Sequence, residues 1–453
     1  MNSIRAFKRV VGYGALVVLL ATSIRTAEAQ ATKTWNGSVN TDWFNPTNWT
    51  PAGVPAAIDT VNFNSGTISF IAPVTISGQF NWSGGTLDGS SLTIATNGVM
   101  NLGGTGAKSL QNTLTNAGTI TFAGSGDLTF YNNLTTYKAA IYNLAGALFD
   151  IQADRNLNCG CYGKELFNNA GLLRKSAGAG TASFGIAVTN TGTITTLQGA
   201  LNFNNGGFLG GTYNAAAGSV INFSGGAFTY QANALPQLNG PGGTRFSGGT
   251  LTLIDNLIPN LTLAAGTLAL GPNFQGGTIT NLSTGSVLSG NYTVSGLLNL
   301  SNGVSGNLQL LSGSTVNWSG GDLTGTNQVA AGAVLNWSAG TLLGPLTVAV
   351  NGMMNTVGSG AKYVENVLTN AGTINFAGSS DLSFYNNLTT YKGAIYNLGG
   401  GLFDIQTDRN FACGCYGKEL FNNAGLLRKS AGSGITSFGI TVTNTGTITT
   451  LQG

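Results

Sequence analysis

Three short segments, Gly118-Thr-Ile-Thr-Phe122, Gly192-Thr-Ile-Thr-Thr-Leu197 and Gly249-Thr-Leu-Thr-Leu253, determine the fold class of this chain. In each segment apolar and polar residues alternate with a period of two, which is typical of a strand with one buried face. Glycine or Asn-Gly closes the runs, and glycine suits corners where φ is positive. No stretch after residue 30 has a helical apolar stripe with capping residues. The sequence therefore predicts an all-β fold of short strands.

These strands recur about every 20 residues, a period that is typical of solenoid repeats. An aromatic-Ser-Gly-Gly marker occurs at Trp82, Phe223, Phe246 and Trp318, and Trp337-Ser-Ala-Gly is a variant of it. A coil of that length cannot bury its own apolar face, whereas stacked coils share one core. We therefore expect a right-handed parallel β-helix, or β-solenoid, of about 21 coils and about 100 Å. Tandem β-sandwiches are the alternative, although each needs about 100 residues.

A longer repeat divides the chain. Residues 107–199 align with 361–453 at an offset of 254, and 76 of the 93 positions match. The similarity extends upstream to the markers at Trp82 and Trp337. The predicted organisation begins with a signal peptide at residues 1–29 and an N-terminal capping segment at 30–80. A first long repeat unit follows at 81–335, and a second, incomplete copy of the unit at 336–453.

The segment that ends at Ala29 predicts export. Basic residues precede a short apolar run, Val10–Leu20, and Ala27-Glu28-Ala29 fits a signal-peptidase cleavage site. The apolar run is shorter than the roughly 20 residues of a membrane span, and we expect no membrane span in the mature chain. Cleavage after Ala29 leaves 14 basic and 14 acidic residues. A chain without net charge is a poor binder of nucleic acid, so no nucleic-acid partner is expected.

Composition excludes several kinds of chemistry. The 453 residues include 70 Gly, only 7% charged residues and no His. The absence of His excludes Ser-His-Asp and Cys-His catalysis and His-ligated metals. We find no P-loop, dinucleotide fingerprint or calcium repeat. We therefore expect no cofactor, no metal and no catalytic residue.

Cysteine occurs as Cys159-Gly-Cys161 and Cys413-Gly-Cys415. In a straight solenoid the two pairs lie about 60 Å apart, whereas a disulfide needs Cα atoms within about 7 Å, so a bond between the pairs is excluded. A four-cysteine zinc site fails for the same reason. Local disulfides, intermolecular disulfides and free thiols remain as three interpretations.

Charged residues concentrate in the repeated block and form a candidate surface site that occurs twice. A solvated loop region is the alternative interpretation of this cluster. Two carboxylates four residues apart on a strand lie about 13 Å apart, too far for glycoside hydrolysis unless a turn intervenes. The candidate residues are Asp150, Asp154, Arg155, Lys164 and Glu165, and their counterparts are Asp404, Asp408, Arg409, Lys418 and Glu419.

The repeats resemble those of a known class of proteins. Phe167-Asn-Asn-Ala-Gly-Leu-Leu-Arg-Lys-Ser-Ala-Gly, Val188-Thr-Asn-Thr-Gly-Thr-Ile-Thr and Phe246-Ser-Gly-Gly-Thr-Leu resemble segments of secreted bacterial adhesin-like and autotransporter-passenger-like β-solenoids. The resemblance implies an extracellular or cell-surface location and assigns no catalytic residue. The sequence shows none of three features that the resemblance leads us to expect at the end of such chains: an outer-membrane barrel, a sorting motif and an apolar anchor.

The sequence therefore predicts an exported structural or adhesive protein of the bacterial surface that is not an enzyme. Its expected partners are surface glycans or other copies of itself. A carbohydrate-binding or carbohydrate-active β-helix, such as a polysaccharide lyase or hydrolase, is the alternative. The aromatic markers fit either a buried stack or a sugar-binding surface, and burial is favoured because large aromatic residues dominate core energetics.

Overall fold

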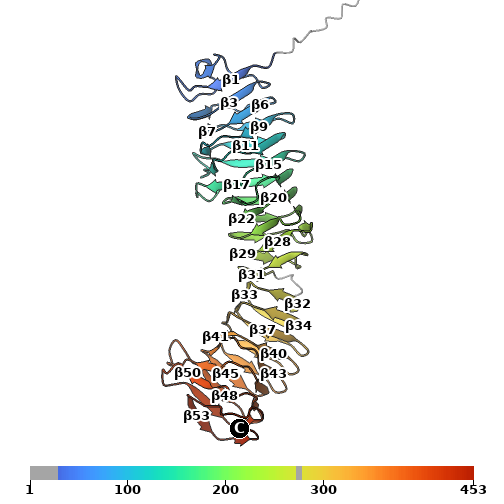
Figure 1. The fold of residues 1–453 in the computed structure, drawn as a ribbon, viewed down its shortest axis with the longest axis vertical. Helices are drawn as coiled ribbons and strands as arrows, with labels where there is room; N and C mark the ends of the chain where they lie inside the picture. Colours follow the sequence, from blue (N-terminus) through green and yellow to red (C-terminus); the bar gives the residue numbers. More distant parts are fainter. Residues whose placement is uncertain (1–28, 272–277) are drawn as a thin grey trace, which may run out of the picture.

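The computed structural model describes residues 29–271 and 278–453, and it is a single elongated rod (Figure 1). The predicted signal peptide lies almost wholly outside the described residues. The rod is a β-solenoid of about 19 turns with coils of roughly 20 residues, which confirms the predicted fold class. A 3-10 turn, Pro46–Asn48, is the one helical element of the described residues. No helix among those residues is long and apolar enough to cross a membrane.

Each coil of the N-terminal half contributes one strand to each of three parallel sheets. Among the strands of the described residues, only β1 and β2 pair antiparallel. The first sheet contains β2 (Trp49–Thr50), β1 (Thr32–Trp35), β3 (Thr60–Phe63), β6 (Gln79–Trp82), β9 (Val99–Leu102), β12 (Thr119–Phe122), β15 (Leu148–Ile151), β18 (Leu172–Lys175), β21 (Thr193–Thr196), β24 (Thr212–Ala215) and β27 (Gln237–Asn239).

The second sheet ends in the middle of the rod, whereas the third runs through almost its whole length. The second sheet contains β4 (Thr67–Phe70), β7 (Gly85–Gly89), β10 (Lys108–Leu110), β13 (Leu128–Phe130), β16 (Leu157–Cys159), β19 (Thr181–Phe184), β22 (Ala200–Phe203), β25 (Val220–Phe223), β28 (Gly243–Phe246) and β30 (Leu261–Leu263). The third contains β5 (Val74–Ile76), β8 (Leu92–Ile94), β11 (Thr113–Asn116), β14 (Ala140–Asn143), β17 (Leu166–Asn169), β20 (Ala187–Asn190), β23 (Gly207–Leu209), β26 (Ala227–Thr229), β29 (Thr250–Leu253), β31 (Thr267–Leu270), β33 (Val287–Ser289), β35 (Val304–Ser305), β38 (Asp322–Leu323), β41 (Gly340–Leu342), β44 (Lys362–Val364), β47 (Leu382–Phe384) and β50 (Phe411–Cys413).

A fourth sheet supplies the other two faces of the C-terminal half. Its two arms meet at the long strand β34 (Tyr292–Leu300), which pairs with β32 (Thr278–Thr284) and extends across two faces. One arm contains β36 (Leu308–Leu310), β39 (Asn327–Val329), β42 (Leu346–Val348), β45 (Val367–Asn370), β48 (Ala394–Asn397), β51 (Leu420–Asn423) and β53 (Thr441–Asn444). The other contains β37 (Thr315–Trp318), β40 (Val334–Trp337), β43 (Met353–Thr356), β46 (Thr373–Phe376), β49 (Leu402–Ile405), β52 (Leu426–Lys429) and β54 (Thr447–Thr450).

The alternation of apolar and polar residues in the sequence matches the alternation of buried and outward-facing side chains in the structure. In β12, Ile120 and Phe122 are buried while the two threonines between and before them face outward. The aromatic markers are buried as well, and the Trp318 and Trp337 rings stack with centroids 4.9 Å apart. These markers are therefore core residues and not a sugar-binding surface.

Asparagine side chains form hydrogen-bonded columns from coil to coil. A buried column runs through Asn116, Asn143, Asn169 and Asn190, with each Nδ2 donating to the next Oδ1 at 2.7–2.8 Å. These residues occupy the corner between the third and first sheets, where the amides also bind backbone carbonyls that the turn leaves free. An outward-facing column joins five asparagines of the C-terminal half at 2.8–2.9 Å: Asn299, Asn317, Asn336, Asn355 and Asn375.

The two copies of the long repeat have corresponding strands on different sheets. Strand β10 belongs to the second sheet, but β44, its counterpart in the second copy, belongs to the third. Likewise β11 is in the third sheet and β45 in the fourth. The displacement by one face arises between β29 and β34. There Pro259, which lacks an amide hydrogen, lies in a segment that adds no strand to the first sheet.

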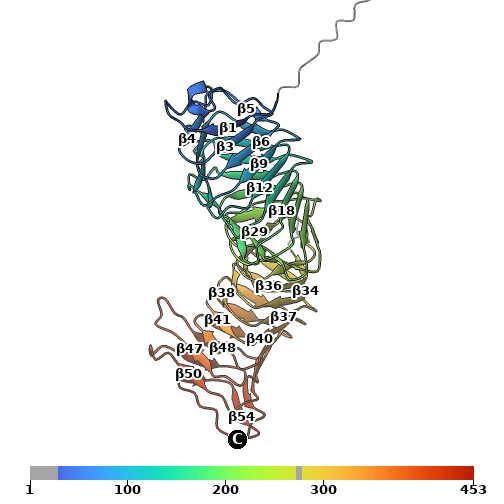
Figure 2. The same ribbon diagram turned by 45° about the horizontal axis from the view of Figure 1, so that its top comes forward.

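Figure 2 shows β4 of the second sheet and β47 and β50 of the third on the same side of the molecule.

The coils number about 19, fewer than the 21 expected, because the coils of the repeated block carry side loops. Thr119 pairs with Leu148 across such a loop, whereas Thr193 pairs with Thr212 after a much shorter stretch of chain. At about 4.8 Å per coil the rod is about 90 Å long.

Candidate functional site

The side loops bring three tyrosines of each copy together on the surface. In the first copy Tyr131 follows β13, Tyr137 lies in the loop before β14, and Tyr162 lies in the loop after β16. Their ring centroids are 5.8–6.4 Å apart. Tyr162 is half exposed. We call this cluster the first tyrosine platform.

The second copy builds the same arrangement, which we call the second tyrosine platform. The ring centroids of Tyr385, Tyr391 and Tyr416 are 5.6–6.2 Å apart, and Tyr416 is half exposed. The loops themselves are identical in sequence between the copies, from Tyr131 to Lys138 and from Cys159 to Glu165.

Side chains of the loop fix its backbone. Asn132 Oδ1 accepts from the amide of Leu134, and Asn133 Oδ1 accepts from the amides of Thr135 and Tyr137. The hydrogen bonds hold Leu134 at φ 63°, a conformation uncommon for residues other than Gly, Asn and Asp, with its side chain exposed. Leu388 repeats this conformation at φ 64°. Residues held in such sparsely populated conformations cluster at functional sites.

The Cys-Gly-Cys segments lie beside the platforms. The structure pairs Cys159 with Cys161 and Cys413 with Cys415, each within one copy. The left-handed residues of these segments are Cys161 and Cys415, at φ 60° and 58°, and not the glycines between the cysteines.

Glu165 is a structural residue of the platform loop. Its carboxylate accepts from the amides of Tyr162, Gly163 and Lys164 at 2.8–3.1 Å, and it is almost completely buried. Glu419 makes the same contacts. Burial alone would raise the pKa of the Glu419 carboxyl, but the backbone amide donors outweigh burial and hold this pKa below its usual value. Neither carboxylate is free for a ligand.

The structure divides the charged cluster that the sequence indicated. Asp150 faces outward from β15 and binds Arg174 of the next coil through both oxygens, at 3.0 and 2.9 Å. Asp154 lies in the following corner and binds Lys175 at 2.7 Å. Burial tends to raise the pKa of Asp154, but the hydrogen bonds from Lys175 and the Gly180 amide, together with the charges of Lys175 and Arg155, outweigh burial and lower this pKa. Lys164 and Glu165 belong to the platform on the next corner.

The second copy repeats both ion pairs. Arg428 binds Asp404 and Lys429 binds Asp408, both at 2.8 Å, with Arg409 beside Asp408. In the first copy, burial tends to raise the pKa of Asp150, but hydrogen bonds from Arg174, Gln152 and Ser176 prevail and lower it. These pairs tie adjacent coils together, so they are structural contacts.

The copies differ beside the platforms. Ser109 of the first copy corresponds to Tyr363, whose ring centroid lies 6.0 Å from that of Tyr385. Gln111 corresponds to Glu365. Burial and the nearby Asp322 raise the pKa of Glu365. Since Lys138 N donates to Gln111 O and Lys392 N donates to Glu365 O, both at 2.8 Å, this position adjoins each platform.

Two buried lysines were not anticipated from the sequence. Lys108 and Lys362 are almost inaccessible to solvent, and burial lowers the pKa of each. Lys108 Nζ donates to Gly106 O, whereas Lys362 Nζ has two partners, Gly360 O and Ser380 Oγ. The signal was present in the sequence, because Lys108 occupies an inward position of an alternating strand.

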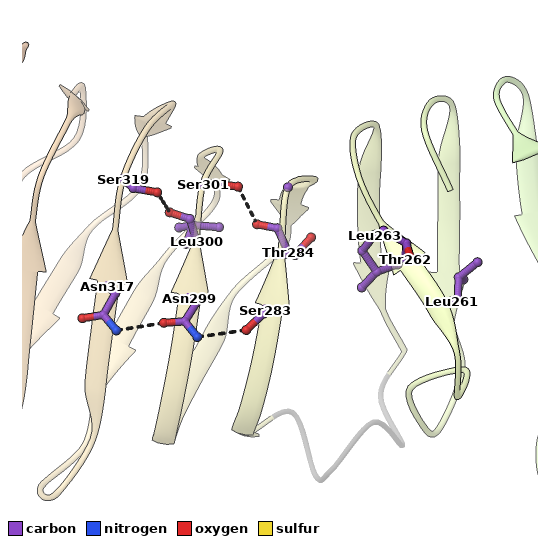
Figure 3. A pocket seen from close by; sticks show the side chains of 11 residues that line it. Leu261, Thr262, Leu263, Ser283, Thr284, Asn299, Leu300, Ser301, Asn317 and Ser319 are labelled. Carbon is purple, nitrogen blue, oxygen red and sulfur yellow. Dashed lines mark hydrogen bonds between the residues drawn. The ribbon is translucent and has the colours of Figure 1, made fainter. Parts of the chain in front are cut away.

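A groove of about 490 Å³ opens where the second sheet ends. Figure 3 shows Leu261 and Leu263 of β30 on one side, and Ser283 and Thr284 of β32 on the other. Asn299 Nδ2 donates to Ser283 Oγ on the β32 side. The lining residues include no ionisable side chain, so the groove has no candidate acid, base or charged ligand.

Comparisons with known proteins show no match: no family model, curated protein or solved structure corresponds to this chain. Within residues 29–271 and 278–453, no group of three or more His, Cys, Asp or Glu side chains is arranged to hold a metal ion. The candidate functional site is therefore defined by geometry alone, and it consists of the two tyrosine platforms.

Proposed function

We propose that the chain is an exported rod of the bacterial surface with a structural and adhesive role, and that the tyrosine platforms make the adhesive contacts. The observation that carries this proposal is the repetition of one ordered, partly exposed aromatic loop. The two copies of the loop stand at separate positions along a single rod (Figure 1), the first carried by β13 and β16 and the second by β47 and β50. The signal-peptide pattern that ends at Ala29 supports export.

The spacing of the platforms suits binding to a surface. From β17 to β50 the third sheet takes twelve steps between strands, or about 60 Å. Two sites held on a stiff spacer bind a repetitive surface with greater avidity than either site alone. A monovalent ligand would not need the repetition.

Retention of coated microspheres tests this role. Microspheres that carry the purified chain are passed over layers of chitin, peptidoglycan and polygalacturonate under flow, and retained spheres are counted. We expect retention on at least one layer, and we expect Tyr162→Ala combined with Tyr416→Ala to abolish it. Tyr142→Ala combined with Tyr396→Ala is the matched control, since both tyrosines lie on strands β14 and β48, outside the platform loops. Equal retention of the two double variants would contradict the proposal.

The alternative function, cleavage of a polysaccharide, has one observation in its favour. Glu365 has a raised pKa, caused by burial and by Asp322 beside it, as a general acid next to a second carboxylate would. Release of reducing ends from polygalacturonate or chitin, abolished by Glu365→Gln, would support this alternative. The first copy has Gln111 at this position, so such an activity would belong to the second copy alone.

A further inference from the structure

We propose that the tyrosine platforms bind an acidic polysaccharide, a chain of uronate-type sugars, and that the first platform binds it more tightly than the second. This inference rests on the proposed adhesive function and names its ligand class. The aromatic rings would stack on pyranose faces, and exposed lysines would pair with the carboxylates.

The rings form an open surface and not a closed cluster. In the first platform the ring planes are inclined by 43–56° to one another, with centroids 5.8–6.4 Å apart. Tyr162 is half exposed, and Tyr131 and Tyr137 are partly exposed. Tyrosine also combines a flat apolar face with a hydroxyl that bonds polar groups, which suits a ligand with apolar ring faces and polar edges.

The charge around the first platform indicates an anionic ligand. Lys138 and Lys164 are both exposed, and each lies close in sequence to a platform tyrosine, Tyr137 or Tyr162. The neighbouring carboxylate, Glu165, is buried and consumed by three backbone amides. A surface with two exposed cations and an engaged carboxylate attracts negative charge.

The loops are organised before any ligand arrives. The Asn132 and Asn133 hydrogen bonds and the Glu165 carboxylate define the backbone on both sides of the platform. Binding therefore needs little further ordering, which is the main cost for flexible loops.

The second platform has an opposing charge. Glu365 stands where the first copy has Gln111, and its backbone carbonyl accepts from the amide of Lys392 in the second platform loop. When ionised, its carboxylate offsets the lysine charge and repels a uronate. Tyr363 adds a fourth ring, which favours the apolar face of a sugar irrespective of charge. The two platforms should therefore differ in their preference for acidic over neutral glycans.

Titration calorimetry of the full chain tests the inference. The probes are trigalacturonate, long polygalacturonate and, as a neutral control, cellotriose. At pH 7 and low salt we expect trigalacturonate to bind more tightly than cellotriose. Tyr162→Ala should weaken the tighter site about tenfold, and Lys138→Gln with Lys164→Gln should weaken trigalacturonate but not cellotriose. The control Tyr142→Ala should leave both unchanged, and circular dichroism confirms that each variant is folded.

Further variants test which platform binds more tightly and whether one polysaccharide chain contacts both platforms. Glu365→Gln should tighten the weaker site for trigalacturonate alone. Long polygalacturonate should bind at least about tenfold more tightly than trigalacturonate, and Tyr416→Ala should remove this advantage, because one chain can then contact only one platform.

The outcomes separate this inference from the proposed function. Equal affinity for trigalacturonate and cellotriose, or no effect of the lysine variants, overturns the acidic-glycan inference. Platform-dependent microsphere retention on chitin would then leave the adhesive function standing. Self-association of the chain that the platform variants abolish, without any glycan binding, would also overturn the inference and assign the platforms to contacts between copies. Loss of both glycan binding and retention would contradict both proposals.

Discussion

The backbone of Gly160 lies against the ring of Tyr131. A Cβ atom added at Gly160 would stand 2.9 Å from Cε1 of that ring and closer still to Cδ1, and Gly414 has the same relationship to Tyr385. Glycine in the Cys-Gly-Cys segment therefore makes room for a platform tyrosine. It is required by close approach of the ring and not by a positive φ.

Substitution of this glycine should displace the platform. In Gly160→Ala with Gly414→Ala we expect Tyr131 and Tyr385 to move, which loosens both side loops without unfolding the rod. Hydrogen exchange should accelerate in residues 131–139 and 159–165 while the first sheet keeps its protection. Gly103→Ala is the control, because nothing lies within 4 Å of a Cβ at that position. Unchanged exchange in the loops would show that the ring does not depend on Gly160.

The local disulfides stay a prediction that mass spectrometry can check. Non-reduced digests should contain the links Cys159–Cys161 and Cys413–Cys415. Because stabilisation by a disulfide grows with the length of the closed loop, Cys159→Ser should change Tm by no more than about 1 °C. A peptide that links Cys159 to Cys413 in a proven monomer would contradict the straight stacking of the coils.

The two asparagine columns should contribute different amounts to the free energy of unfolding. Asn169→Ala removes one acceptor of the buried Asn143 amide and the side-chain donor to the Asn190 oxygen, and should cost about 3 kcal/mol. Asn336→Ala interrupts the outward column, where water replaces the lost partners, and should cost about 1 kcal/mol or less. Thermal unfolding followed by circular dichroism measures both. Equal losses would show that burial does not set the cost.

Acid should weaken the Asp150–Arg174 pair. The pKa of Asp150 is lowered in the folded chain, so the pair stabilises above the unfolded pKa of about 3.9, and this stability is lost as pH falls through the folded pKa. Asp150→Asn should therefore lower stability by about 2 kcal/mol at pH 7 and should have little effect below the folded pKa. Melting curves from pH 7 down to pH 2 test this. A penalty that is independent of pH would assign the effect to packing.

Burial of the Lys108 amine should lower the stability of the folded chain at neutral pH. Burial lowers its pKa, so between the folded pKa and the unfolded value of about 10.4 the folded chain binds fewer protons. Stability of the native chain should therefore rise with pH in that window. Lys108→Met should raise Tm at pH 7, with an advantage that shrinks towards pH 10. The exposed Lys164→Met is the control, and a lower Tm of Lys108→Met at pH 7 would contradict the interpretation.

Much of the fold could be predicted because the residue pattern of a strand shows which of its side chains face the core. Alternation in segments such as Gly118–Phe122 identifies which side chains face inward, and the regular spacing of these segments identifies a coil. The burial of Trp82 and Trp318 follows from the same pattern. The long repeat also predicts corresponding strands in both copies, and β10 to β18 indeed correspond to β44 to β52.

Contacts between coils could not be predicted in the same way, because they depend on the number of residues that each corner contains. The charged cluster of the repeated block looks like one site in the sequence, yet corners separate Asp150 from Glu165, and each carboxylate binds its own structural partners. The tyrosines were overlooked because an aromatic residue in a loop has the same appearance in the sequence whether it is buried or exposed.

The sequence by itself determined that the chain is a repetitive β-solenoid, since period-two alternation and a shared core require nothing beyond local pattern. Only the tertiary structure decided that Tyr131, Tyr137 and Tyr162 meet on one surface and that Glu365 adjoins the second of these surfaces. The physical reason is that stacking places residues from successive coils about 4.8 Å apart, whatever their separation along the chain.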